Sequence, residues 1–478
     1  MKPTWNLALE LDRGSHLPLP QQLVNAVVEG VRRGRLAPGA GVPSTRRLAA
    51  ELGVHRNTVV AAFDDLVAQG WLETTRASHT RVTRALPERV TEAGRRGRGI
   101  GFELGAWKSS AATFEAVPKR VLDFTGGLPD PRLFDSRLLA RAYRRALKRT
   151  SLDFGSPAGD PVLRARLAAM LSQRRALAVT ADDLLVTRGS QLALHLLALA
   201  MVRRGDVVAV ESPGYPSARE AFSLPGARLL PIPVDAEGLD VEALAKRLRT
   251  TRVRALYVTP HHQDPTTVTL SARRRLRLLE LARVHRFAVI EADYDYEFQY
   301  DAAPVLPMAS SDAHGVVVYV GTLSKALAPG LRVGFVAAPR PLLEAMLAVR
   351  GQVDRQGDLV LERAVAELLD DGEVLRHSLK ARRVFHARRD LLGALLERRL
   401  GGALQFELPR GGLALWAKAA RGIDVERWAR RGLERGVRFF TGRSYSPSGE
   451  KLPYLRLGFG HLDERELEEA VRRMATAQ

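Results

Sequence analysis

From about Val121 to the end, short apolar runs alternate with longer segments of helical pattern. The runs DLLVTRG, DVVAVESPGY, VRALYVTP, FAVIEADY and GVVVYVGT are each followed by a stretch long enough for a helix. Strands that alternate with helices form a mostly parallel sheet covered on both faces. After about Leu342, helices surround the strand-like segments LQFELPRGGLALWA and PYLRLGFG. Residues 121–478 therefore predict an α/β domain with a smaller α+β lobe.

Residues 15–85 have a different pattern, that of a small helical module. The apolar spacing predicts helices over 18–35, 45–51 and 55–69, and Ser44 is the expected N-cap of the second helix. The segments WLETT and TRVT then predict two short strands joined by a turn. This order is that of a winged helix-turn-helix, whose second helix enters the major groove of DNA.

Candidate DNA contacts lie at the start of that recognition helix. Arg56 can form a fork onto guanine or phosphate, and Asn57 and Thr58 can reach base edges or phosphates. Each of these side chains could equally be part of a solvated polar face. The order of the elements as a whole favours DNA binding.

Further contacts are expected from the flanking elements. Arg46, at the start of the preceding helix, can clamp the DNA backbone, and Thr80 and Arg81 lie where a wing would meet the minor groove. Residues 86–120 contain RRGRGIG and KSSAAT with little apolar periodicity, which predicts a flexible linker to the second domain.

The chain of 478 residues carries 73 Lys and Arg against 53 Asp and Glu, a net charge of +20. This excess suggests an anionic partner, with nucleic acid the first candidate, although the bases are spread along the chain. Cysteine is absent, which excludes disulfides, a thiolate nucleophile and cysteine-ligated zinc. No apolar run approaches the ~18–20 residues of a membrane span, and the first residues lack a signal-peptide pattern. We expect a cytoplasmic protein.

Lys325 is the candidate reactive residue of the second domain. It follows the apolar strand VVVYVGT in the segment GTLSKALAPGLRVGF. A desolvated lysine with a lowered pKa can form a Schiff base with an aldehyde. Thr322 and Ser324 offer hydroxyls, and Arg332 offers a fork, to one phosphate. The alternative is a surface lysine at the end of a strand.

Three other segments contribute candidates to the same site. In LLVTRGSQ, a strand runs into a helix at Gly189, Ser190 and Gln191, whose free N–H groups could hold a phosphate. Tyr215 follows another strand and could stack on a flat cofactor, or be a core aromatic. Arg456 lies within the apolar strand YLRLGFG and needs an anion, either a ligand carboxylate or a structural ion pair.

The stretch 18–82 resembles the GntR family of bacterial regulators, through PGAGVPSTRRLAAELGVHRNTV and QGWLETT. His55 stands where the family usually has Ser or Thr. The turn ASHT, residues 77–80, lacks the family's glycines and so loses easy access to positive φ. The resemblance implies the following DNA contacts: Arg46, Arg56, Asn57 and Thr58.

The stretch from about Asp123 to the end resembles the fold-type I, class I/II aminotransferases, which bind pyridoxal phosphate. The likeness rests on FTGGLPD, VTRGSQ, VESPGY, VTPHHQDPT, VIEADYDYEF, GTLSKALAPGLRVGF and LRLGFG. It implies a Schiff base on Lys325, a ring stacked on Tyr215, Tyr294 near the O3′ oxygen and a ligand α-carboxylate on Arg456. The residues implied to hold the phosphate are Gly189, Ser190, Gln191, Thr322, Ser324 and Arg332.

Both modules in one chain resemble the MocR/GabR-type subgroup of GntR regulators. Members of that subgroup are described as head-to-tail homodimers. In them an amino-acid-like ligand, or the cofactor itself, changes the binding of operator DNA. The resemblance covers nearly all of the chain.

The sequence departs from these patterns at several positions of the second domain. Ala292 replaces the acid that normally faces the pyridine nitrogen, and strand alternation should point Asp293 to the other face. Phe154 stands where a Tyr usually reaches the partner's phosphate. Asp264 replaces a common Asn near O3′, and Thr267 replaces a Gly.

Three hypotheses are compatible with this pattern. The first is a transcriptional regulator that senses pyridoxal phosphate, an amino-acid-like effector, or both, through an imine on Lys325. The second is an active aminotransferase with an incidental DNA-binding module, and the loss of acid at Ala292 argues against it. The third is a regulator whose second domain has lost the cofactor.

Overall fold

The computed structural model describes residues 5, 9–75, 79–87, 120–301 and 305–478. The chain divides into two compact units, Met1–Phe114 and Glu115–Gln478. The expected linker over 86–120 lies almost entirely outside the described residues. No helix of the described part is long and apolar enough to cross a membrane.

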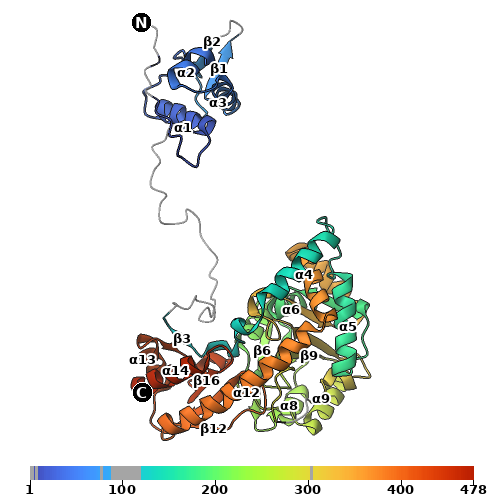
Figure 1. Cartoon of the computed structure of the whole chain (residues 1–478). Helices are drawn as coiled ribbons and strands as arrows, with labels where there is room; N and C mark the ends of the chain where they lie inside the picture. Colours follow the sequence, from blue (N-terminus) through green and yellow to red (C-terminus); the bar gives the residue numbers. More distant parts are fainter. Residues whose placement is uncertain (1–4, 6–8, 76–78, 88–119, 302–304) are drawn as a thin grey trace. The chain divides into compact units, whose positions relative to one another are not determined.

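The first unit contains three helices followed by two antiparallel strands, the order predicted from the sequence (Figure 1). Apolar side chains from all three helices and both strands form one core. The second strand begins one residue earlier than the predicted segment TRVT. The elements are α1 (Leu19–Arg32), α2 (Thr45–Leu52), α3 (Arg56–Ala68), β1 (Leu72–Thr75) and β2 (His79–Val82).

Local signals set the ends of α2 and the start of α3. The Ser44 hydroxyl accepts the N–H of Arg47 at 3.3 Å, which confirms the predicted N-cap. Gly53 ends α2 with φ 60°, a conformation that glycine adopts without steric cost. His55 caps α3, because its Nδ1 accepts the N–H of Asn57 at 3.3 Å. The imidazole of His55 thus takes the capping position where the GntR pattern usually has the hydroxyl of Ser or Thr.

The second unit is built on an eight-stranded sheet in the order β4-β11-β10-β9-β8-β5-β6-β7. The five strands from β10 to β6 run parallel, whereas β11 is antiparallel to both neighbours and β7 is antiparallel to β6. The predicted α/β class is confirmed. The strands are β4 (Leu184–Thr187), β5 (Val207–Ser212), β6 (Arg228–Asp235), β7 (Gly238–Leu239), β8 (Val253–Val258), β9 (Ala288–Asp293), β10 (Val317–Thr322) and β11 (Gly334–Ala337).

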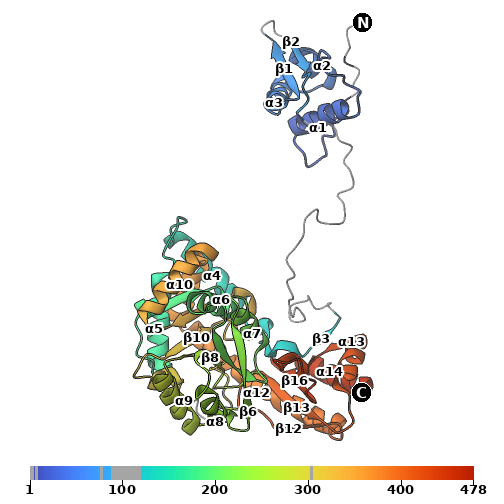
Figure 2. The ribbon, with the colours of Figure 1, turned by 180° about the vertical axis from the view of Figure 1, so that it is seen from behind.

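Helices cover both faces of this sheet. On one face α6, α7 and α10 form a single apolar cluster with the strands, and Figure 2 shows α6 and α10 in front of the sheet. On the other face, α8 and α9 cover one half and α4, α5 and α11 cover the other. These helices are α4 (Ser136–Arg149), α5 (Pro161–Arg175), α6 (Gly189–Met201), α7 (Pro216–Ser223), α8 (Val241–Leu248), α9 (Ala272–His285), α10 (Arg340–Val353) and α11 (Leu359–Asp370).

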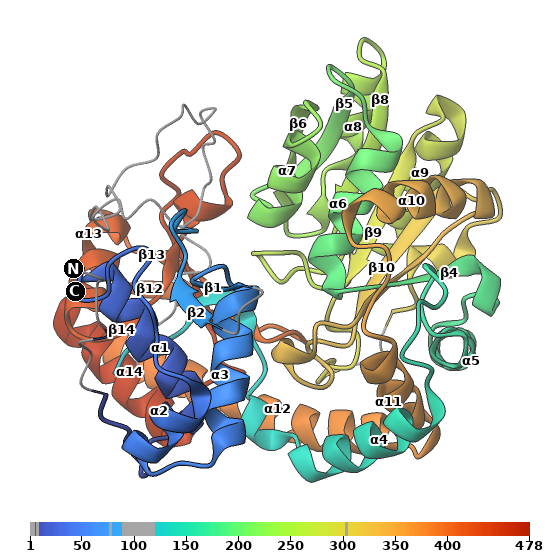
Figure 3. The ribbon, with the colours of Figure 1, turned by 90° about the horizontal axis from the view of Figure 1, so that it is seen from above.

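The smaller lobe is a four-stranded sheet, β12-β13-β16-β15, covered by three helices. The long helix α12 contacts α11 at the large lobe and α14 at the small one (Figure 3). A short strand pair, β3 with β14, joins the start of this unit to the small lobe. The elements are β3 (Leu122–Asp123), α12 (Glu373–Leu400), β12 (Leu404–Phe406), β13 (Ala414–Ala419), α13 (Val425–Glu434), β14 (Val437–Arg438), β15 (Phe440–Thr441), β16 (Tyr454–Gly458) and α14 (Glu464–Ala477).

Candidate ligand site and DNA-binding helix

The candidate site lies where the parallel strands β9 and β10 end. These strands are neighbours, and their last paired residues are Asp293 and Gly321. Ligands of open α/β sheets bind in the crevice outside such carboxyl ends. Tyr294 follows β9 directly, and Lys325 follows β10 after a short turn. The two meet in space, because the Lys325 Nζ lies 4.0 Å from the centre of the Tyr294 ring.

Lys325 is half-buried and makes no ion pair with the described residues. Burial lowers the pKa of its amine to about 8, against an opposing effect of Asp295 and Asp264. Arg456 adds to the lowering by charge repulsion. A substantial fraction of the amine is therefore neutral near physiological pH. This is the form that attacks an aldehyde.

A group of hydrogen-bond donors lies beside this lysine. Helix α6 begins at Gly189, and its preceding residue provides no side-chain cap, so the first N–H groups of the helix need another acceptor. The Arg332 guanidinium lies against Gly189, where a Cβ atom would be 2.6 Å from its Nη2. The buried Ser324 hydroxyl has no hydrogen-bond partner among the described residues. These orphaned donors, with a glycine where no side chain fits, suit a phosphate.

The other predicted phosphate residues are less free. The Thr322 hydroxyl already donates to the Val333 carbonyl at 3.2 Å and accepts the N–H of Ser324 at 3.1 Å. The Gln191 amide donates to the Ser217 carbonyl at 3.3 Å, and its buried oxygen has no partner within the described residues. The structure thus brings the two predicted segments together, with Thr322 partly committed to its own turn.

Tyr294 is held by a network that the sequence patterns did not reveal. Its hydroxyl donates to the His262 carbonyl at 2.5 Å. The His262 ring bonds Asp295 through Nδ1 at 2.7 Å and Gln299 through Nε2 at 2.8 Å. Burial lowers the pKa of His262, but Asp295 and Gln299 outweigh it and leave the pKa above its ordinary value. These side chains lie in the motifs VTPHHQD and YDYEFQ, whose polar residues could have indicated such a network.

Arg456 does form an ion pair within the chain. Its Nη2 lies 3.1 Å from Oδ2 of Asp264, and both side chains are buried. The Tyr445 ring centre is 6.0 Å from the guanidinium carbon. On another side, a Cβ at Gly127 would come within 3.2 Å of the guanidinium nitrogens. The structural ion pair, one of the two alternatives raised for Arg456, is therefore present, and contact with a ligand carboxylate stays a prediction.

The backbone of Asp264 is held by hydrogen bonds to neighbouring buried side chains. Its backbone N–H donates to the Thr259 hydroxyl at 3.0 Å, and that hydroxyl donates to Glu211 at 2.6 Å. Burial raises the pKa of Glu211 to about 8, against the lowering effect of the hydrogen bonds from Thr259. Oδ1 of Asp264 is buried and has no partner within the described residues. Asp264 therefore keeps one oxygen for Arg456 and one oxygen free.

The two faces of β9 carry different chemistry. Ala292 lies in the apolar cluster under α6 and α7, the face against which Tyr215 packs. Asp293 points to the opposite face, where it accepts the Tyr319 hydroxyl and lies 3.5 Å from Arg175. The expected alternation holds, so Asp293 does not take over the role of an acid at Ala292.

Two further departures have visible consequences. Thr267 adopts φ 65°, a conformation that costs a β-branched residue strain and that the family's glycine would adopt freely. Phe154 is 68% exposed, and its ring lies 3.9 Å from the guanidinium carbon of Arg355. Next to it, Leu152 is 81% exposed.

A single arginine joins the two lobes beside the site. Arg219 on α7 donates to the carbonyls of Gly214 at 2.9 Å, Tyr445 at 2.6 Å and Ser444 at 3.0 Å. The N–H of Gly214 also donates to the Tyr445 carbonyl at 3.0 Å. The Tyr215 segment of the large lobe is thus fastened to the small lobe.

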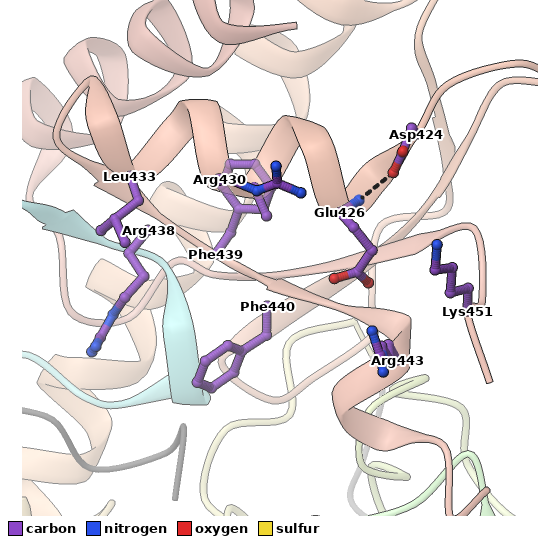
Figure 4. Close-up of a pocket in the computed structure, with 10 residues that line it drawn as sticks. Asp424, Glu426, Arg430, Leu433, Arg438, Phe439, Phe440, Arg443 and Lys451 are labelled. Atoms are coloured by element: carbon purple, nitrogen blue, oxygen red, sulfur yellow. Dashed lines mark hydrogen bonds between the residues drawn. The ribbon is translucent and has the colours of Figure 1, made fainter. Parts of the chain in front are cut away.

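A separate hollow of about 430 Å³ lies in the small lobe, between α13 and the following strands. In Figure 4, Glu426 points between Arg443 and Lys451, and Arg430 lies above them. The hollow shares no residue with the Lys325 site, and three of its basic side chains, Arg430, Arg443 and Lys451, are exposed. We therefore place the chemistry at Lys325.

The predicted DNA contacts lie together on the first unit. Arg46, Arg56, Asn57 and Arg81 are exposed, Thr58 and Thr80 are half-buried, and the three arginines form no ion pair with the described residues. They are therefore available to phosphates and base edges. Arg46 lies on α2; Arg56, Asn57 and Thr58 form the first turn of α3; Thr80 and Arg81 lie on β2.

Comparison with known proteins accounts for both units. The model of bacterial regulatory proteins of the gntR family matches residues 19–82, and that of aminotransferase class I and II matches 128–474. The probable rhizopine catabolism regulatory protein MocR of Rhizobium meliloti is 30% identical over 476 residues, covering 98% of this chain and 95% of its own. The chain belongs to the MocR-type regulators of the GntR family.

Further similarities support each part of this MocR-type regulator. The HTH-type transcriptional regulator TauR of Rhodobacter capsulatus is 32% identical, with 97% of each chain covered. LysN, an α-aminoadipate aminotransferase from Thermus thermophilus, has a crystal structure with N-(5′-phosphopyridoxyl)-L-leucine. It is 32% identical to this chain with a TM-score of 0.70, covering 75% of this chain and 92% of its own. The expected family and fold are confirmed.

Proposed function

We propose that this regulator binds operator DNA through α3 and holds pyridoxal phosphate at Lys325, where an amino compound alters DNA binding. The observation that carries the proposal is the state of Lys325. Its amine has a pKa of about 8, lies 4.0 Å from the Tyr294 ring centre and forms no ion pair with a carboxylate of the described residues. A lysine kept for structure alone would be paired or fully solvated.

The donors beside Lys325 fit the cofactor. The start of α6, the unpartnered Ser324 hydroxyl and Arg332 would hold its phosphate, and Tyr215 and Tyr294 would bound its ring. When bound, pyridoxal phosphate supplies an aldehyde that combines reversibly with primary amines. Ala292 offers no acid on the ring face, which favours a sensor of amines over an efficient transaminase.

Absorbance spectroscopy tests the cofactor proposal. We expect a band in the near-ultraviolet or visible region when pyridoxal phosphate is added to the full chain, and no such band with Lys325→Ala. Lys246→Ala is the matched control, because Lys246 is an exposed lysine of α8. An equal band in all three proteins would disprove the assignment. Absence of the band in the wild type would favour a regulator without the cofactor.

Electrophoretic mobility shifts test the DNA proposal. Binding that uses Arg46, Arg56 and Arg81 should weaken steeply with salt, and replacing one phosphate contact should reduce the log–log slope by about 1. Arg32→Ala is not a suitable control, since Arg32 packs over Trp71. Arg35→Ala, at an exposed position after α1, is the control. A slope unaffected by all three substitutions would contradict binding through this face.

We infer that the regulator acts as a head-to-tail homodimer. The neighbouring side chains of Leu152 and Phe154 are both strongly exposed, at the segment where the family reaches its partner subunit. Exposed apolar groups of this size favour association. Light scattering should give twice the chain mass of 52.5 kDa, and Leu152→Asp should shift the distribution to single chains.

A further inference from the structure

Asp264 occupies the place that a ligand carboxylate would need. Arg456 is the arginine that the resemblance assigns to an α-carboxylate, and Asp264 already lies 3.1 Å from it. Both side chains are at least nine-tenths buried. An ion pair in such a place is costly to break, because separating the partners leaves an uncompensated charge.

The surrounding structure holds Asp264 in this position. Its backbone is fixed through the Thr259 hydroxyl, which is itself bonded to the buried Glu211. The residue before it adds a further contact, since the Gln263 side chain donates to the carbonyls of Pro213 and Asp264. The backbone of Asp264 is therefore fixed, and its carboxylate is held by the ion pair with Arg456.

The acidic side chains at this end already have partners without a ligand. Arg456 faces Asp264, and His262, with its raised pKa, faces Asp295. An arriving carboxylate would have to displace Asp264 and would meet the negative charge of its second oxygen, which has no partner within the described residues. Like charges at such distances disfavour binding strongly in a buried site.

We propose that Asp264 acts as an internal substitute for the α-carboxylate, so that the site selects primary amines with no carboxylate on the amine-bearing carbon. This inference rests on the proposed function, because it concerns the ligand of the Lys325 site. It predicts an amine effector and makes Asp264 the residue that sets specificity. Asp264→Asn keeps the size of the side chain and removes its charge.

The test compares 3-methylbutylamine with L-leucine, which differ only by the α-carboxylate. Both are titrated into the full chain loaded with pyridoxal phosphate, and dissociation constants are read from the shift of the Lys325-dependent band. The wild type should bind the amine at least tenfold more tightly than leucine. In Asp264→Asn, leucine should gain at least tenfold and the amine should change less than threefold.

A second substitution identifies the group that Asp264 covers. In the Asp264→Asn background, Arg456→Gln should abolish the gain for leucine, because the released arginine provides the carboxylate contact. Asp293→Asn is the matched control, since this buried acid lies on the opposite face of β9. It should keep the wild-type ratio between the two compounds.

The results separate this inference from the proposed function. Equal or tighter binding of leucine by the wild type, an unchanged ratio in Asp264→Asn, or no response to either compound would overturn it. So would a leucine gain that survives Arg456→Gln. If the wild type forms no Lys325-dependent band, the cofactor proposal fails. The same two compounds are then compared by calorimetry on the cofactor-free chain, and the same ratios decide the role of Asp264.

Discussion

The two ends of the Lys325 site differ in how far the chain satisfies its own polar groups. At the α6 end, the Ser324 hydroxyl has no partner within the described residues, and Arg332 reaches only the Arg188 carbonyl, at 3.5 Å. At the other end, Arg456 is already paired with Asp264. An anion can therefore enter the α6 end without breaking a contact, whereas at the Arg456 end it must displace an ion pair.

The largest effect is expected from disabling the open end. Arg332→Leu should weaken pyridoxal phosphate binding by about 10- to 150-fold, the equivalent of a lost charged hydrogen bond of ~1.5–3 kcal/mol. Binding of pyridoxal, which lacks the phosphate, should stay unchanged. The control is Arg273→Leu on α9, an exposed arginine elsewhere. Equal losses for both compounds would show that Arg332 does not contact the phosphate.

The pH dependence of cofactor binding probes the lysine between the two ends. Lys325 reacts as the neutral amine, and burial lowers its pKa to about 8. The rate at which the band appears should therefore rise about tenfold per pH unit and level off above about pH 8. Stopped-flow absorbance measures it. Asp295→Asn should move the break to lower pH, because Asp295 raises the pKa of Lys325. A flat profile from pH 6 to 9 would contradict this account.

An acid introduced at Ala292, on the face expected to contact the cofactor ring, should strengthen cofactor binding and lower stability. Ala292→Asp should tighten cofactor binding by about tenfold, since the acid can pair with the ring nitrogen. Without cofactor the protein should lose ~1–3 kcal/mol, because the acid lies within an apolar cluster. Absorbance titration and urea unfolding measure the two effects. Ala292→Asn should share the loss of stability and lack most of the gain, and a gain of equal size there would exclude a role for charge.

The smallest effect is expected at Thr267. Thr267→Gly should stabilise the protein by about 0.5–1 kcal/mol, because relief of the strained φ of 65° exceeds the entropy cost of glycine. Thr267→Ala keeps the Cβ atom and should give no comparable gain. Urea unfolding distinguishes the two. A loss of stability in Thr267→Gly would mean that the threonine makes contacts worth more than its strain.

Local chemistry made much of this structure predictable. Ser44 caps its helix because Ser is a strong N-cap, and strand alternation places Ala292 and Asp293 on opposite faces. Several of the predicted site segments, those of Gly189, Tyr215, Tyr294 and Lys325, each follow a strand of the large sheet, the kind of place where ligands of such sheets bind. The pairing of Asp264 with Arg456 could not be predicted in this way. Their segments are far apart in the chain, and the local sequence around one residue does not predict its contact with the other.

The same limit applies to the network behind Tyr294. His262 and Asp295 come from loops after different strands, and only the register of the sheet brings them to 2.7 Å. A buried histidine in a sequence does not reveal its partner. The sequence thus predicts which elements form the site, whereas its internal ion pairs depend on the folded sheet.

The contacts of Arg219 between the two lobes affect the rate at which a bound ligand can leave. The Arg219 side chain bonds two carbonyls of the small lobe, those of Ser444 and Tyr445, so both bonds must break before the lobes part along this edge. Hydrogen bonds to a charged group contribute ~1.5–3 kcal/mol each. A molecule enclosed behind that edge would leave at the pace of this opening. Arg219 would then set the residence time of a bound ligand, and so how long the regulator keeps its ligand-bound state after the free ligand has been removed.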